Sequence, residues 1–144
     1  MLLKDIMTKN PEEVPVIESV MDAAEKMKEL NVGAIPVFKN DKVVGIVTDR
    51  DIAIRAVAEG KDPKDTPVMD IMSRNIISCP ENTDLKDAAH IMEQNKVRRL
   101  IVTDQSGKAV GIVSLGDIAT KAKMMDIGFE VLEKVSEPSR PAVH

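Results

Sequence analysis

The sequence of 144 residues has almost no aromatic side chains, with Phe38 and Phe129 but neither tyrosine nor tryptophan. Proteins that bind single-stranded nucleic acids stack the bases on such side chains. An excess of positive charge is also missing, because 20 basic residues are outnumbered by 24 acidic ones. A surface that binds nucleic acid needs this excess to neutralise the phosphates. We therefore expect no nucleic-acid partner.

Cysteine and long apolar runs are scarce too. The single cysteine, Cys79, excludes an intramolecular disulfide framework. No apolar run approaches the roughly 20 residues that cross a bilayer, and the apolar stretch at the N-terminus is too short for a signal peptide. We expect no membrane partner and a cytoplasmic location.

Motifs for catalysis and for metal binding are absent as well. His90, His144 and Cys79 cannot assemble a zinc site. The sequence contains no P-loop, G-x-G-x-x-G, H-E-x-x-H or nucleophile-elbow motif. We expect no catalytic residue, no metal site and no required cofactor, and we expect the protein not to be an enzyme.

What the sequence does contain is an internal repeat. Residues 5–8 (Asp-Ile-Met-Thr) match residues 70–73 (Asp-Ile-Met-Ser), an offset of 65. After one extra residue the offset becomes 66, where Val-Gly-Ile-Val at 44–47 meets the same four residues at 110–113. A duplication explains both matches. We expect four parts, which are repeat 1 at 1–60, a linker at 61–69, repeat 2 at 70–127 and a partly disordered tail at 128–144.

Each repeat has a first helix that its apolar spacing predicts. Apolar residues recur at positions i, i+3, i+4 and i+7 from Val20 and again from Leu85, which is typical of an amphipathic helix. Ser19 and Asp84 precede these stretches and are expected to be their N-caps.

Strands and a second helix follow in each repeat. Pairs of short apolar runs separated by turn residues predict hairpins, at 34–38 with 43–47 and at 100–102 with 109–113. Second helices are expected at 51–59 and 117–125. Each repeat is thus a β-α-β-β-α unit, too open to bury both faces of its sheet. We expect an α+β fold in which the two units pack sheet to sheet with pseudo-two-fold symmetry.

In both repeats a buried strand ends in a hydroxyl residue, and an aspartate follows three positions later. These pairs are Thr48 with Asp51 and Ser114 with Asp117. One interpretation is a capping box, in which each side chain accepts a hydrogen bond from the backbone of the other residue. The other interpretation is a ligand site, because a carboxylate at a helix N-terminus can accept the hydroxyls of a ribose. The spacing alone leaves both open.

These motifs together resemble CBS (cystathionine-beta-synthase) domains. The resemblance rests on G-I-V-(T/S)-x-x-D-I, on the D-I-M start of each repeat, and on the strands at 32–37 and 97–102. It implies paired domains with two clefts between them, which in many members bind AMP, ADP, ATP, S-adenosylmethionine or NAD. It also implies a homodimer.

The resemblance further implies which residues contact the ligand. Asp51 and Asp117 would be the ribose-binding carboxylates, with Thr48 and Ser114 as nearby polar contacts. The other ligand-binding positions that the family pattern implies are Arg98, Arg99, Gly33, Ala34, Ile46 and Ile112.

Arg98 and Arg99 are the positions that the family pattern assigns to the ligand phosphate. A guanidinium suits this role because it is planar, permanently charged and bidentate. The alternative is a surface pair that balances nearby acidic residues. Gly33 and Ala34 replace the pair in repeat 1, so we expect two unequal sites.

The leading functional hypothesis is a regulatory module that binds an adenosine-containing ligand and acts in trans on a partner protein, whose identity the sequence does not give. A ligand-free dimerisation or interaction scaffold is the alternative. A small enzyme that acts on nucleotides is a remote third hypothesis, because no base, nucleophile or metal site is evident.

Overall fold

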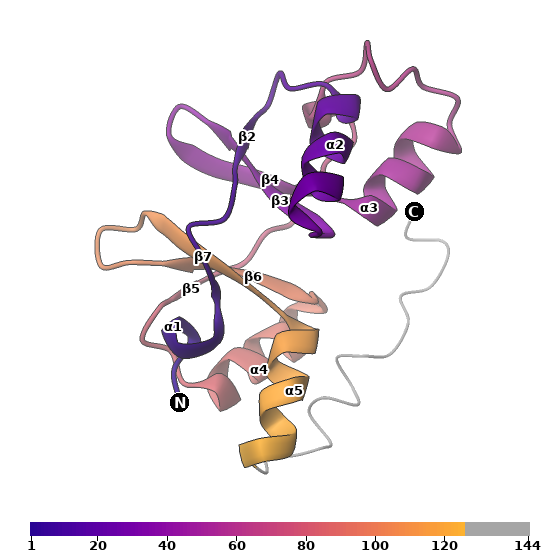
Figure 1. The fold of residues 1–144 in the computed structure, drawn as a ribbon. Helices are drawn as coiled ribbons and strands as arrows, with labels where there is room; N and C mark the ends of the chain where they lie inside the picture. The colour runs from indigo at the N-terminus through magenta and orange to yellow at the C-terminus, as the bar shows by residue number, and fades with distance from the viewer. Residues whose placement is uncertain (126–144) are drawn as a thin grey trace. The chain divides into compact units, whose positions relative to one another are not determined.

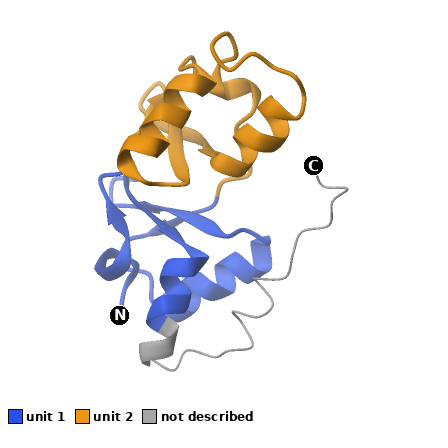
Figure 2. Ribbon diagram, turned by 45° about the vertical axis from the view of Figure 1, so that its right-hand side comes forward, with its two compact units in different colours: residues 1–11, 77–144 blue, residues 12–76 orange. Residues whose placement is uncertain are grey.

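The computed structural model describes residues 1–125, so the tail expected at 128–144 lies outside the described residues. The chain forms two compact units (Figure 2). Among the described residues, unit 1 contains 1–11 and 77–125, and unit 2 contains 12–76. Each unit has a small sheet with helices packed on it (Figure 1).

Unit 2 has a three-stranded sheet in the order β2-β3-β4. Strand β2 is parallel to β3, and β3 is antiparallel to β4. In chain order its elements are β2 (Val14–Pro15), α2 (Val20–Leu30), β3 (Ala34–Lys39), β4 (Lys42–Thr48), α3 (Asp49–Asp51), the π-helix η1 (Ile52–Val57) and the 3-10 helix η2 (Val68–Asp70).

The first helix of unit 2 is the one that the apolar spacing predicts. Ser19 is its N-cap, and the Ser19 hydroxyl accepts a hydrogen bond from the backbone of Asp22 at 3.0 Å. The helix ends at Asn31, which has the left-handed backbone that stops an α-helix. Three residues of the predicted stripe, Val20, Ala23 and Met27, are buried in the core, where they pack with residues of β3, β4, η1 and the segment after the linker, and the fourth, Ala24, is half-buried.

Unit 1 has a four-stranded sheet in the order β1-β7-β6-β5. Strand β5 is parallel to β6, and the other neighbours are antiparallel. Its elements are α1 (Leu3–Ile6), β1 (Thr8–Lys9), β5 (Ser78–Pro80), α4 (Leu85–Asn95), β6 (Arg99–Thr103), β7 (Ala109–Ser114) and α5 (Leu115–Met125). Asp84 caps α4 by accepting a hydrogen bond from the backbone of Lys86, as predicted for the N-cap position.

The two repeats exchange their first segments. Thr8 of repeat 1 pairs with Ile112 of repeat 2, and Ser73 of repeat 2 pairs with Ile46 of repeat 1. These pairs occupy equivalent repeat positions, so the exchange is reciprocal. The compact units therefore differ from the repeat boundaries at 1–60 and 70–127, because each D-I-M segment completes the sheet of the other repeat.

Glycines in β4 and β7 allow these segments to approach. A Cβ on Gly45 would lie 2.7 Å from Sδ of Met72 and 2.8 Å from the carbonyl oxygen of Ser73. A Cβ on Gly111 would collide with Sδ of Met7. A glycine inside a strand often marks such a close approach.

The α+β class with two sheets is confirmed, and so are the two hairpins. The sheet-to-sheet packing of the repeats remains a prediction. The second helix of repeat 1 differs from expectation, since it starts at Asp49 and continues as a π-helix. Within residues 1–125, no helix is both long and apolar enough to cross a membrane.

Candidate ligand-binding site

In unit 2, Thr48 and Asp51 form a reciprocal capping box where β4 ends and the next helix begins. The Thr48 hydroxyl accepts a hydrogen bond from the Asp51 backbone at 3.0 Å, and Oδ2 of Asp51 accepts one from the Thr48 backbone at 3.0 Å. Both side chains thus satisfy backbone N–H groups that a helix start leaves unpaired. The capping interpretation is confirmed here, and it uses only part of the acceptor capacity of Asp51.

Asp51 has further partners in unit 2. The Ser73 hydroxyl donates to Oδ1 of Asp51 at 3.1 Å and lies 3.3 Å from Oδ2. Nε of Arg55 lies 3.9 Å from Oδ1, a long ion pair. Asp51 is only 7% exposed, so its charge is held in a mostly buried position by groups of the protein itself.

Arg55 also holds the segment that carries Ser73. Its Nη1 donates to the carbonyl oxygens of Ile71 at 3.3 Å and Met72 at 3.2 Å. Arg55 lies in the π-helix, and such helices are rare and often found at functional sites.

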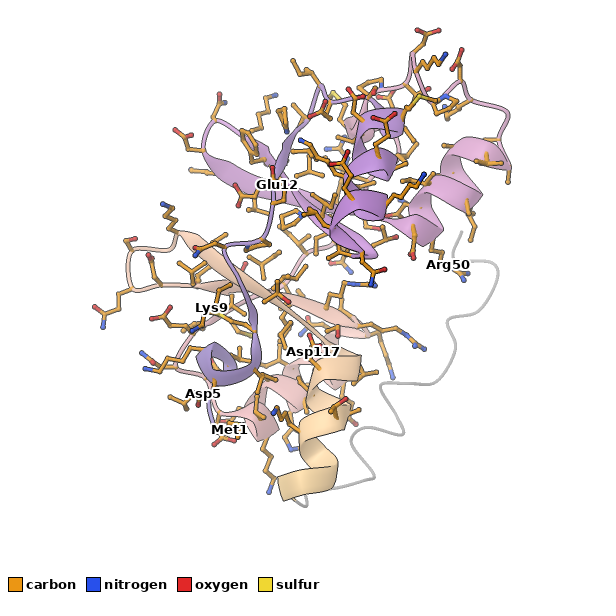
Figure 3. The ribbon with its side chains drawn as sticks, viewed as in Figure 1. Met1, Asp5, Lys9, Glu12, Arg50 and Asp117 are labelled. Atoms are coloured by element: carbon orange, nitrogen blue, oxygen red, sulfur yellow. The ribbon has the colours of Figure 1, made fainter. Side chains whose placement is uncertain are left out.

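In unit 1, Ser114 and Asp117 form the same capping box at the start of α5. Oδ2 of Asp117 accepts from the Ser114 backbone at 2.9 Å, and the Ser114 hydroxyl accepts from the Asp117 backbone at 3.1 Å. Figure 3 shows Asp117 at this end of the helix. Asp117 is half-buried, and within the described part of the chain its carboxylate has no partner beyond the box.

The repeat equivalents of Ser73 and Arg55 behave differently in unit 1. Thr8 stands at the position of Ser73, is exposed, and makes no side-chain hydrogen bond to Asp117 among the described residues. Lys121 replaces Arg55. The two aspartates share a sequence pattern but have different surroundings.

The two arginines that the sequence singles out lie beside the unit 1 box. Arg99 begins β6 and is paired across the strands with Ser114. The carbonyl oxygen of Arg98 accepts from the Leu115 backbone at 2.7 Å, which fixes Arg98 next to the start of α5. The structure therefore brings Arg98, Arg99, Ser114 and Asp117 to one edge of the unit 1 sheet.

Gly33 and Ala34 hold the equivalent places in unit 2. Ala34 is paired across the strands with Thr48, and the carbonyl oxygen of Gly33 accepts from the Asp49 backbone at 3.0 Å. Oδ2 of Asp49 lies 3.0 Å from the position that a Cβ on Gly33 would take. A carboxylate therefore stands beside Gly33, and the arginine pair has no counterpart at these positions.

Ile46 and Ile112 lie two residues before the capping hydroxyls. Ile46 is paired with Pro36, and Ile112 with Ile101, in the two hairpins. Their neighbours Val47 and Val113 belong to the helix-facing cores. Since side chains alternate along a strand, both isoleucines face away from the helices of their own units, on the same side as Thr48 and Ser114.

The sequence reasoning missed Ser73 and Arg55. A contact between residues that are 22 positions apart, as Ser73 and Asp51 are, leaves no local spacing signal. The strand glycine Gly45 was the available clue, because it indicates that another backbone passes close to β4.

Other titratable groups form no second site in the described chain. Cys79 is buried, and this burial raises the pKa of its thiol. Nδ1 of His90 lies 3.7 Å from a carboxylate oxygen of Glu93 on the same helix. Among residues 1–125, no group of three or more His, Cys, Asp or Glu side chains is arranged to hold a metal ion.

Comparison with known proteins agrees with the duplicated architecture. The CBS domain family matches residues 3–57 and residues 68–123. The CBS domain-containing protein YhcV of Bacillus subtilis is 40% identical over 134 residues, which cover 93% of this chain and 94% of YhcV.

Solved structures are similar over most of the chain. The CBS domain pair of protein MJ0100, in complex with 5′-methylthioadenosine and S-adenosyl-L-methionine, has 31% identity and a TM-score of 0.76, covering 87% of this chain and 98% of that one. CBSX2 in complex with AMP has 30% identity and a TM-score of 0.68, with the same coverage of 87% and 98%. The chain therefore belongs to the CBS domain family and contains a tandem pair of these domains.

Proposed function

We propose that this protein is a regulatory module that binds an adenosine-containing ligand and acts in trans on a partner protein. Two similar structures carry such ligands, since MJ0100 is in complex with 5′-methylthioadenosine and S-adenosyl-L-methionine and CBSX2 with AMP. The proposed binding requires neither a metal ion nor a catalytic residue. The residues at the start of α5 supply the ligand contacts.

The observation that carries the proposal is the set of groups around Asp117. Its carboxylate has acceptor capacity beyond the capping box, and two hydroxyls of a ribose are suitable donors for it. Arg99, paired across the strands with Ser114, places a cation at the same sheet edge. A guanidinium there would bind a phosphate or carboxylate group attached to the adenosine.

A regulatory module must couple ligand binding to a conformational change that its partner protein can detect. A ligand shifts an equilibrium between two conformations only by its difference in affinity for them. We propose that the occupied and empty states differ in the surface they offer to an effector protein, and that the module is a homodimer, as is frequent in the family.

A ligand panel tests the proposal. The melting temperature is measured with AMP, ATP, NAD, S-adenosylmethionine and 5′-methylthioadenosine, because a ligand at 100 times its dissociation constant adds about 2.7 kcal/mol of stability. We expect at least one of them to stabilise the wild type and the effect to be lost in Asp117→Asn. Asp84→Asn, which alters the N-cap of α4, is the matched control and keeps the response. A flat response of the wild type to every compound contradicts the proposal.

A ligand-free scaffold is the second candidate, because both aspartates already have capping partners without a ligand. In that case the wild type responds to no compound, and substitutions of Asp51 and Asp117 change stability alone. The panel therefore separates a sensor from a scaffold.

A further inference from the structure

We infer that Ser73 occupies the carboxylate of Asp51 in place of a ribose hydroxyl, so that adenosine ligands bind at Asp117 and not at Asp51. This inference rests on the proposed function and deepens it. The Ser73 hydroxyl competes with the hydroxyls of a ribose for the carboxylate of Asp51, and we therefore expect one occupied site per chain.

The chemistry of the contact supports a competitor. The Ser73 hydroxyl lies 3.1 Å from Oδ1 and 3.3 Å from Oδ2 of Asp51. A serine hydroxyl and a ribose hydroxyl are the same kind of donor, so they would compete for the same lone pairs. Oδ2 is already engaged by the Thr48 backbone, which leaves less capacity for the two hydroxyls of a ribose.

Hydrogen bonds hold the backbone of Ser73 and of the two residues before it in place. Ser73 exchanges two backbone hydrogen bonds with Ile46, at 2.8 and 3.0 Å. Arg55 holds the carbonyl groups of Ile71 and Met72 just before it, and these two side chains are 1% and 4% exposed in the unit 2 core. The serine therefore stays close to Asp51.

A tethered donor has an advantage over a dissolved one. A ligand loses translational and rotational freedom when it binds, whereas Ser73 is already positioned by the fold. The ligand would also have to reach a carboxylate that is only 7% exposed and leave the Ser73 hydroxyl without its partner. Both effects disfavour binding at Asp51.

The equivalent position in unit 1 shows the contrast. Thr8 is exposed and makes no side-chain bond to Asp117 within the described chain. Lys121 stands where unit 2 has Arg55, so the guanidinium that holds the segment before Ser73 has no counterpart at this position. Asp117 thus keeps acceptors that Asp51 has already used.

Calorimetric titration with 5′-methylthioadenosine tests the inference, because this probe has no phosphate and does not need an arginine pair, which Gly33 and Ala34 replace in unit 2. We expect one site in the wild type and its loss in Asp117→Asn. Ser73→Ala in the Asp117→Asn background should restore a site, with affinity at least about tenfold above that of Asp117→Asn alone, as expected for freeing a charge-assisted acceptor. Adding Asp51→Asn should abolish that site.

Two controls accompany these variants. Ser73→Thr keeps a hydroxyl and should leave the Asp51 site closed, and Thr8→Ala should restore nothing in the Asp117→Asn background. Amide chemical shifts of the wild type need no substitution. When 5′-methylthioadenosine saturates the protein, we expect the amide chemical shifts of residues 114–118 to change and those of residues 48–52 to stay the same.

The outcomes separate this inference from the proposed function. If the wild type binds the probe but Ser73→Ala opens no second site, or weakens binding, the inference fails and the proposed function stands. Shift changes at residues 48–52 in the wild type also overturn it. If neither the wild type nor Ser73→Ala binds the probe, the inference about Ser73 and the proposed function are both wrong for this ligand class.

Discussion

Arg99 lies directly across the β6–β7 pair from Ser114, and Ser114 shares a capping box with Asp117. The strand pair and the box therefore place a cationic residue and an anionic one at the same sheet edge. Residues directly opposite each other in an antiparallel pair point to the same face. The arrangement suits a ligand that has hydroxyls at one end and an anionic group at the other.

The first prediction concerns the selectivity that Arg99 gives to the site. Arg99→Ala should weaken AMP binding by about tenfold or more, because a hydrogen bond to a charged group contributes about 1.5–3 kcal/mol. Binding of 5′-methylthioadenosine, which has no phosphate, should change much less. Titration of both ligands measures the difference.

Arg74→Ala is the control for Arg99→Ala. Arg74 is exposed and donates to the carbonyl oxygen of Met69 in unit 2, so its loss should leave both affinities unchanged. Equal losses for AMP and 5′-methylthioadenosine in Arg99→Ala would show that Arg99 supports the fold of the site and does not bind the phosphate.

The second prediction compares the two aspartates in the absence of ligand. Asp117→Ala should cost about 1 kcal/mol of unfolding free energy, as expected for the loss of a helix cap. Asp51→Ala should cost about 2–3 kcal/mol, because the Ser73 hydroxyl and the Arg55 guanidinium lose their partner as well. Urea denaturation measures both values. Equal costs would mean that the additional contacts of Asp51 contribute nothing to stability.

Local sequence signals predicted the helices α2 and α4 and the positions of the two capping boxes. Ser19 and the apolar spacing from Val20 act within one or two helical turns, so the pattern contains what is needed to place α2. The Thr48–Asp51 pair is equally local, and its two interpretations differed only in what else contacts the carboxylate.

The exchange of first segments could not be predicted in the same way. Asp-Ile-Met occurs in both repeats, so either segment is compatible with either sheet. The sequence does not indicate whether a segment pairs with the sheet of its own repeat or with that of the other repeat. The contact of Ser73 with Asp51 depends on that choice. The sequence predicted unequal sites partly because Gly33 and Ala34 replace the arginine pair in repeat 1. The structure adds a further difference, the contact of Asp51 with Ser73, a residue 22 positions away.

The third prediction concerns the strand glycines that face the exchanged segments. Gly45→Ala should destabilise the protein by about 1–3 kcal/mol, as overpacking does, because the new Cβ would lie 2.8 Å from the backbone oxygen of Ser73. A backbone atom cannot move away as a flexible side chain can. Gly111→Ala should act in the same direction against Met7 and Thr8.

Gly116→Ala is the matched control for these two substitutions. Gly116 is exposed in the first turn of α5, and its nearest neighbour would be 3.6 Å from the new Cβ, an ordinary contact. Alanine is also the better helix former. The unfolding free energy should stay the same or rise slightly, and a loss as large as that of Gly45→Ala would contradict the close-approach explanation.

The last prediction tests whether the N-terminal segment belongs to the core of the second repeat. Leu3 is fully buried in the unit 1 cluster that also contains Cys79. Leu3→Ala should therefore destabilise this cluster by about 2–5 kcal/mol, the usual cost of a buried leucine. The thiol of Cys79 reports on the stability of this cluster, because a buried thiol with a raised pKa reacts only when the core opens.

Labelling of Cys79 at neutral pH measures the effect. The rate should become at least about tenfold faster in Leu3→Ala, since 1.4 kcal/mol corresponds to a factor of ten in the open population. Leu30→Ala, at a leucine that is 49% exposed, should leave the labelling rate unchanged. An unchanged rate in Leu3→Ala would show that the first eleven residues do not stabilise the unit in which they are found.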